Sequence, residues 1–87
     1  MIIKNPYYES YEEIQNKYNG YCVFIIKCKG NRVQPIGGEV VAYNEDLGAL
    51  TKEIQHIINS DEDLGLYTIK TLKDVVDIGI VQVLTHA

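Results

Sequence analysis

The sequence contains two cysteines, Cys22 and Cys28, and their spacing shows whether they could form a disulfide. They lie within residues 21–29, an apolar run typical of a β-strand, on positions that share one face. Six strand residues span about 20 Å, whereas a disulfide requires Cα atoms within about 7 Å of each other. We therefore predict two buried free thiols, as in a reducing cytoplasm. We also expect no metal site, because no further ligands are suitably spaced.

Two other motifs resemble ligand-binding loops, and each lacks a residue that the chemistry needs. Gly37-Gly38 is not followed by a Lys at phosphate-loop spacing, so a β-bulge is the better interpretation. Residues 61–65 read Asp-x-Asp-x-Gly, as in a calcium loop. Ile69 and Leu72 would then occupy two ligand positions that require oxygen donors. We predict neither a phosphate site nor a calcium site.

The histidines and the N-terminal tyrosine motif also have plain structural interpretations. His56 and His86 have no Cys or carboxylate at metal or catalytic-triad spacing, which favours surface positions. Asn5-Pro6-x-Tyr8 matches a short phosphotyrosine-domain motif, but four residues recur easily by chance, and a turn is favoured. We therefore expect no catalytic residue and no cofactor, and we class the protein as non-enzymatic.

Composition predicts a single globular domain over residues 1–87, with residues 1–9 as an N-terminal extension. Hydrophobic residues make up 46% and charged residues 23%, and the formal net charge is −4. The acidic balance disfavours nucleic acid as a partner, and no apolar run is long enough to span a membrane. We expect a cytoplasmic location, since the first residues lack a signal-peptide pattern. Residues 45–87 carry eight acidic and three basic side chains, which indicates either solvated surface or a docking face for a basic partner.

The order of predicted elements indicates an α+β fold. Ser10 and Glu13 form a capping box for a short helix over residues 10–19, and Leu47, Leu50 and Ile54 lie on the apolar stripe of a main helix over residues 46–59. The sheet is predicted to be mainly antiparallel, with about four strands including a β-hairpin. The remaining elements are a strand at 66–69, a helical turn at 71–76 and a strand at 78–84.

The hairpin supplies the candidate interaction surface. A two-residue turn at Gly30-Asn31 would pair Lys29 with Arg32 and Ile26 with Pro35. Because Pro35 has no N–H, the second strand is predicted to be a sheet edge at that point, leaving residues 39–43 able to pair with a partner strand. The candidate interaction residues are Pro35, Gly37, Gly38, Glu39, Val41 and Tyr43.

Three segments resemble a small prokaryotic domain family of unknown function. They are residues 18–23 (Tyr-Asn-Gly-Tyr-Cys-Val), residues 38–43 (Gly-Glu-Val-Val-Ala-Tyr) and Asp46-Leu47 with Leu50. The resemblance covers residues 10–58 and departs in a longer hairpin and a larger C-terminal part. It implies the order strand, strand, helix, and it implies no activity.

We expect a small cytoplasmic protein that acts through protein–protein contact as a homodimer, because two strands that are apolar on both faces exceed what two helices can cover. One alternative is an acidic inhibitor or immunity-type protein that covers a basic partner. The other is a small ligand binder or enzyme with its site between subunits.

Overall fold

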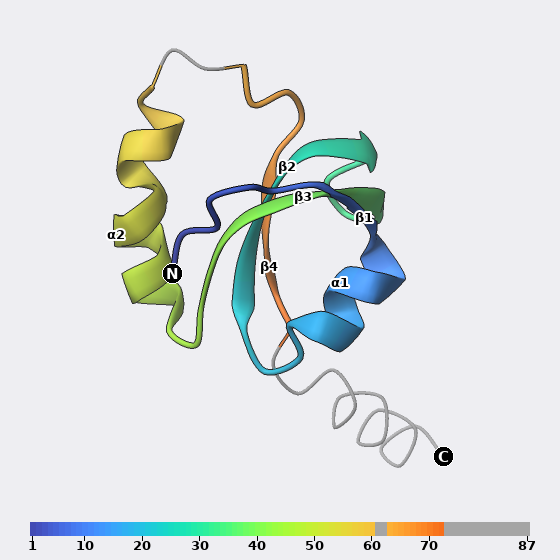
Figure 1. The fold of residues 1–87 in the computed structure, drawn as a ribbon, viewed down its shortest axis with the longest axis horizontal. Helices are drawn as coiled ribbons and strands as arrows, with labels where there is room; N and C mark the ends of the chain where they lie inside the picture. The colour runs from blue at the N-terminus through green and yellow to red at the C-terminus, as the bar shows by residue number, and fades with distance from the viewer. Residues whose placement is uncertain (61–62, 73–87) are drawn as a thin grey trace.

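The computed structural model of the chain describes residues 1–60 and 63–72, and it shows an α+β fold (Figure 1). The elements are β1 (Tyr8–Ser10), α1 (Tyr11–Lys17), β2 (Cys22–Gly30), β3 (Pro35–Asn44), α2 (Leu47–Ile58) and β4 (Thr68–Thr71). The strands form one antiparallel sheet in the order β1-β3-β2-β4. The predicted fold class is confirmed. The helical turn predicted at 71–76 and the strand predicted at 78–84 lie outside the described residues, except that Thr71 ends β4.

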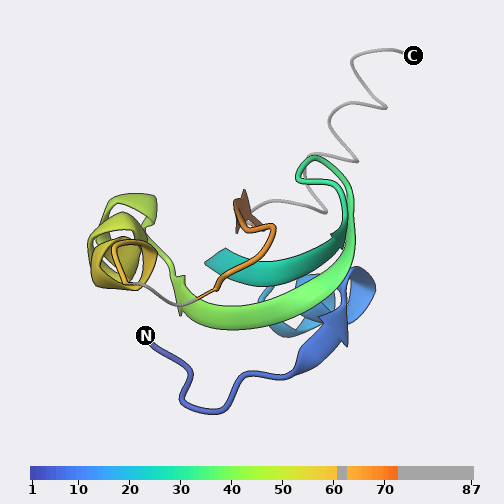
Figure 2. The same cartoon turned by 90° about the horizontal axis from the view of Figure 1, so that it is seen from above.

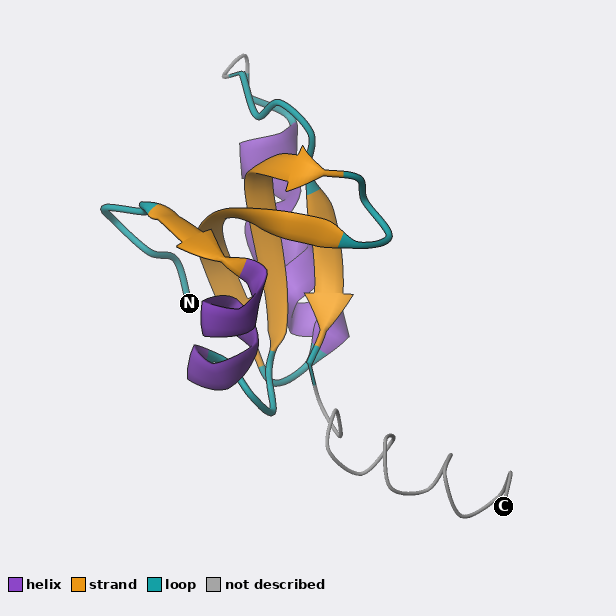
Figure 3. Cartoon of the chain, turned by 90° about the vertical axis from the view of Figure 1, so that its right-hand side faces the viewer, coloured by secondary structure: helices purple, strands orange, loops and turns teal. Residues whose placement is uncertain are grey.

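β2 is an internal strand whose first five residues, 22–26, are all buried. Because side chains alternate across a strand, Phe24 packs in a cluster with α2, and Val23 and Ile25 pack in a second cluster with α1. Figure 3 shows the two helices on opposite faces of the sheet. The single chain therefore covers both faces of β2. The prediction of a second subunit also rested on a strand at 78–84, which lies outside the described residues, so it stays a prediction.

α1 begins at the predicted capping box. The Glu13 backbone N–H donates to the Ser10 hydroxyl at 3.2 Å, and the Ser10 backbone N–H donates to the Glu13 carboxylate at 3.1 Å. The box satisfies donors that the first helical turn leaves without partners. Ile14 and Tyr18 are buried against the sheet.

The capping box has a predicted pH signature. Hydrogen bonds from the Ser10 backbone and then from its hydroxyl hold the pKa of Glu13 below its ordinary value of 4.5. Because the folded-state pKa is depressed, this stabilisation is present above about pH 4.5 and is lost as the pH falls through the folded pKa. A carbon-13 NMR titration is expected to give a Glu13 midpoint below 4.5, and Ser10→Ala is expected to raise it. A midpoint that Ser10→Ala leaves unchanged would contradict this origin of the shift.

α2 confirms the predicted main helix. The Asp46 side chain accepts a hydrogen bond from the Ala49 N–H at 2.9 Å and so caps its first turn. Leu50 and Ile54 are fully buried against the sheet, and Ile57 and Ile58 are half-buried. From Leu50 onward the stripe of apolar residues therefore faces the core as the 3.6-residue period requires, whereas Leu47, predicted to lie on the same stripe, is 47% exposed at the first position of the helix.

The β2–β3 hairpin differs from the predicted two-residue turn. Gly30 pairs with Pro35, so residues 31–34 form the loop. The Asn31 side chain accepts hydrogen bonds from the backbone N–H groups of Val33 and Gln34, at 2.9 and 2.8 Å. This side chain stabilises the longer loop, and the predicted pairs Lys29–Arg32 and Ile26–Pro35 are wrong.

The outer side of β3 is occupied, so the predicted free edge over residues 39–43 is wrong. β1 pairs with β3 from Tyr8 opposite Glu39 to Ser10 opposite Gly37. The first residues of the chain continue this pairing: the Ile3 N–H donates to the Val41 carbonyl, and the Tyr43 N–H donates to the Met1 carbonyl. Figure 2 shows this N-terminal segment running alongside β3. Residues 1–3 and 8–9 therefore bond to β3, so the predicted extension is joined to the sheet at both of its ends.

One of the three register shifts between β2 and β3 places its extra residue in β2, opposite the Gly37-Gly38 position where a bulge was predicted. Ile26 pairs with Glu39 and Lys29 pairs with Gly37, so β2 carries one extra residue between these pairs. Lys27 has a positive φ of 51°. The bulge reverses the alternation of side chains, and Cys28 consequently packs with the α1 cluster while Cys22 packs with the α2 cluster. The prediction that both cysteines share one face is wrong.

The bulge also delays the start of β4. The Lys27 and Cys28 N–H groups donate to the carbonyls of Leu64 and Leu66, at 2.9 and 2.8 Å. Residues 64–66 therefore dock on the bulge as a loop, and regular pairing begins at Thr68 and not at Leu66 as predicted.

Candidate functional site

The predicted interaction residues do not form one exposed surface. Pro35, Gly37, Gly38 and Val41 are buried, and Glu39 and Tyr43 are half-buried. Two of the six, Glu39 and Val41, line a groove that the sequence patterns did not indicate.

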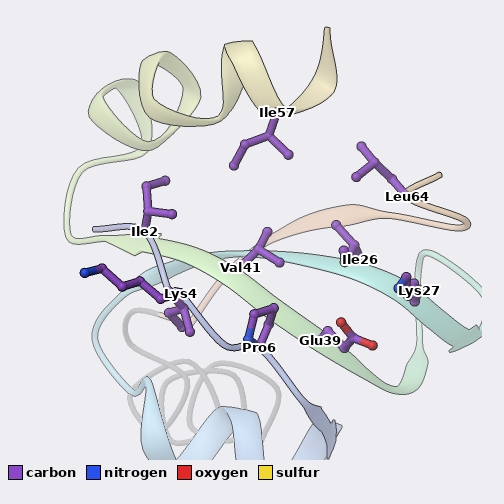
Figure 4. Close-up of a pocket in the computed structure, with 10 residues that line it drawn as sticks. Ile2, Lys4, Pro6, Ile26, Lys27, Glu39, Val41, Ile57 and Leu64 are labelled. Atoms are coloured by element: carbon purple, nitrogen blue, oxygen red, sulfur yellow. The ribbon is translucent and has the colours of Figure 1, made fainter. Parts of the chain in front are cut away.

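The groove lies on the α2 face of the sheet and has a volume of about 290 Å³ (Figure 4). Its floor is formed by Ile26 of β2 and Val41 of β3. Ile57 from the last turn of α2 and Leu64 from the loop before β4 form its walls. The N-terminal segment closes the remaining side with Ile2, Ile3, Lys4 and Pro6. An apolar concavity of this kind suits a small ligand or a single side chain of a partner.

Lys27 lies at the rim of the groove because of the bulge in β2. In a regular strand Ile26 and Lys27 would point to opposite faces of the sheet, yet both line the same groove. The left-handed backbone of Lys27 redirects its side chain, at a cost of roughly 1–2 kcal/mol for a residue with a Cβ. Strain held at one residue beside a concavity is a marker of functional sites.

Two glycines allow the bulge to pack. A Cβ on Gly38 would lie 2.6 Å from Ile25 Cγ2 and 2.9 Å from the Ile26 carbonyl oxygen, so a side chain there would displace β2. Gly65, in the loop before β4, has a φ of +61°, and a Cβ added there would lie 3.5 Å from Lys27 Cα. Gly38 therefore allows the backbones of β2 and β3 to approach each other closely.

The groove carries both signs of charge. Figure 4 shows the Glu39 carboxylate on the side of the floor where Lys27 lies, and the Lys4 ammonium on the opposite side. Within residues 1–60 and 63–72, neither Lys27 nor Glu39 has a side-chain hydrogen bond or an ion pair. The sequence signal that could have indicated this site is Lys27 itself, a cation that interrupts an apolar run in an internal strand.

A second exposed feature is the hairpin arm, residues 29–36. It presents Val33 and Ile36, which are 77% and 66% exposed. The cations around it fold back on their own chain: the Arg32 guanidinium lies over the Tyr67 ring, and the Lys70 ammonium donates to the Val33 carbonyl at 2.8 Å. The arm therefore offers apolar side chains beside cations that already have partners.

A third cluster surrounds Glu9, which is buried although it is charged. The Lys17 ammonium lies 3.4 Å from its carboxylate and donates to the Tyr7 hydroxyl at 3.2 Å. The hydrogen bond to Tyr7 is the main reason that the pKa of Lys17 is raised. This cluster ties α1 to β1, and its groups already satisfy one another.

The residues considered for metal or redox chemistry do not assemble into such a site in the described part of the chain. Cys22 and Cys28 are free thiols, and burial raises the pKa of Cys28. Among the described residues, no group of three or more His, Cys, Asp or Glu is placed to hold a metal ion. No described helix has the length and apolar character needed to cross a bilayer.

Comparison of the chain with protein-family models, with curated proteins and with solved structures gave no match. The resemblance to a prokaryotic domain family therefore stays a prediction.

Proposed function

We propose that this is a cytoplasmic, non-enzymatic protein that acts through protein–protein contact as a homodimer, and that the hairpin arm is its contact surface. The exposure of Val33 and Ile36 carries the proposal, because large aliphatic side chains at a loop tip gain free energy only when a partner covers them. The two free thiols are compatible with a reducing cytoplasm.

A second copy of the chain is the partner that fits this surface. In a two-fold dimer the same patch meets itself, so an apolar patch is self-complementary, whereas a patch of free cations would repel itself. Lys29 lies over the Tyr8 ring, and Arg32 and Lys70 are bound to their own chain. These contacts hold the cations beside Val33 and Ile36 against their own chain and leave them charged, so the association is expected to strengthen with added salt.

The size of the arm sets the strength of the association. Stable interfaces bury about 1,200–2,000 Å² in total, and a few exposed side chains fall well below this. We expect a dimer that forms reversibly and whose population rises with concentration.

Sedimentation equilibrium over a wide concentration range tests the proposal. The wild-type chain is expected to approach twice the monomer mass at high concentration, and the double variant Val33→Ser, Ile36→Ser is expected to stay monomeric. Leu47→Ser is the matched control, because Leu47 is 47% exposed at the start of α2, away from the arm. A monomer at every concentration, or a double variant that dimerises like wild type, would rule the proposal out.

A further inference from the structure

The groove over Ile26 and Val41 combines three features that a single small molecule can satisfy at once. Its floor and two of its walls are aliphatic, and one end of its rim carries an exposed cation, Lys27, beside a half-buried anion, Glu39, with a second exposed cation, Lys4, on the opposite side. The geometry points to a binding site for a free aliphatic α-amino acid. Its carboxylate would face Lys27, its ammonium would face Glu39, and its side chain would lie on the apolar floor.

Size supports this class of ligand. A cavity of about 150 Å³ accommodates benzene, so a groove of about 290 Å³ accommodates roughly ten non-hydrogen atoms. Leucine has about nine non-hydrogen atoms, so it fits this limit. A long acyl chain exceeds the volume of the groove, and a polar amino acid would leave the floor uncovered.

Charge distinguishes an amino acid from a simple fatty acid or amine. At the end of the groove away from Lys4, a carboxylate alone would gain from Lys27 but would be repelled by Glu39, and an amine alone would experience the reverse. Only a zwitterion pairs with both groups. Within the described residues, neither the Lys27 nor the Glu39 side chain forms an ion pair, so a ligand would not have to break one.

The backbone supports a ligand-directed role for Lys27. Its positive φ is unfavourable for any residue with a Cβ, and Gly would adopt it without strain. The conformation places an ammonium group on the groove that holds Glu39, instead of on the α1 face. This site is separate from the hairpin tip, so its test does not depend on dimerisation.

NMR amide-shift titrations with matched probes test the inference. The probes are L-leucine, 4-methylpentanoate (leucine without its ammonium), 3-methylbutylamine (leucine without its carboxylate) and L-serine. We expect L-leucine to bind with a dissociation constant in the millimolar range and to shift amides around Ile26, Glu39 and Leu64. Each of the other probes is expected to bind at least about threefold more weakly, since each lacks one of the three contacts.

Charge-removing variants assign the two ends of the ligand. Glu39→Gln is expected to weaken L-leucine at least about threefold and leave 4-methylpentanoate unweakened, whereas Lys27→Met weakens both. Lys52→Met and Glu12→Gln, at exposed positions outside the groove, are the controls and should bind like wild type. If Lys27→Met does not fold, Lys27→Gly removes the same charge and relieves the backbone strain. The site is ruled out if L-leucine gives no saturable shifts, if 4-methylpentanoate binds wild type as tightly as L-leucine, or if the groove variants match the controls.

Discussion

Replacing Gly38 with Ala is expected to lower the free energy of unfolding by about 3 kcal/mol, because the new methyl group would overlap fixed atoms of β2. A Cβ at this position would lie 2.6 Å from Ile25 Cγ2, 2.9 Å from the Ile26 carbonyl oxygen and 3.3 Å from Cys28 Cα. Two of these atoms belong to the backbone of an internal strand and cannot move without shifting the bulge. The loss is a large part of the roughly 4–13 kcal/mol expected for a domain of this length.

Urea denaturation followed by circular dichroism measures the effect, and Gly20→Ala is the control. Gly20 has a φ of +95°, and a methyl group added there would have no atom within 4 Å, so the substitution tests backbone strain without overlap. We expect it to cost about 1 kcal/mol. Equal losses for the two variants would show that the close approach of β2 and β3 at Gly38 is unimportant. Gly38→Ala should also disturb the amide signals of residues 26–28, since the bulge lies directly opposite.

Replacing Phe24 with Ala is expected to cost about 4 kcal/mol, the largest loss among the substitutions considered. Phe24 is fully buried at the centre of β2, and its ring packs edge-on against Tyr67 with the centroids 5.7 Å apart. Removing the ring leaves a cavity between the sheet and α2, and neither Leu50 nor Ile54 can fill it without breaking its own packing.

Thermal and urea unfolding measure this loss. We expect the folded state of Phe24→Ala to be only marginally stable at 37 °C. The control is Ile69→Ala, since Ile69 pairs with Phe24 across β2 and β4 but is 37% exposed. We expect this control to cost about 1 kcal/mol. A Phe24→Ala loss no larger than that of Ile69→Ala would mean that the α2 cluster is not the main core.

The chain determines its local elements strongly enough to be predicted without the structure. The Ser10–Glu13 capping box, the apolar stripe of α2 and the two-faced β2 depend on residues that interact within a few positions or along one element. These contacts follow from backbone geometry, so the residue types alone indicate them. The same reasoning identifies the α+β class, because the order of the elements restricts how they can pack.

The pairing partners of those elements depend on tertiary contacts, and there the sequence patterns were insufficient. The absence of an N–H at Pro35 correctly indicated that no third strand pairs with the outer side of β3 at that point. It did not indicate that the chain's own first residues would cover the rest of that side, through the bonds to Val41 and Tyr43. Those bonds use main-chain groups that every residue carries, so no residue type in residues 1–9 reveals them.

The groove also combines features that follow from the sequence with features that depend on tertiary contacts. Ile26 belongs to the apolar run of residues 21–29 and is buried, and Val41, which was predicted to be an interaction residue, is buried as well. Only the bulge at Lys27 turns its ammonium onto the same side as Ile26, and a bulge shifts side-chain alternation by one residue without changing composition. The sequence therefore determined which residues prefer the interior and where helices begin. Only the tertiary structure determined that a charged side chain lies beside the buried residues of the groove, because a register shift depends on how the backbones of two strands pair.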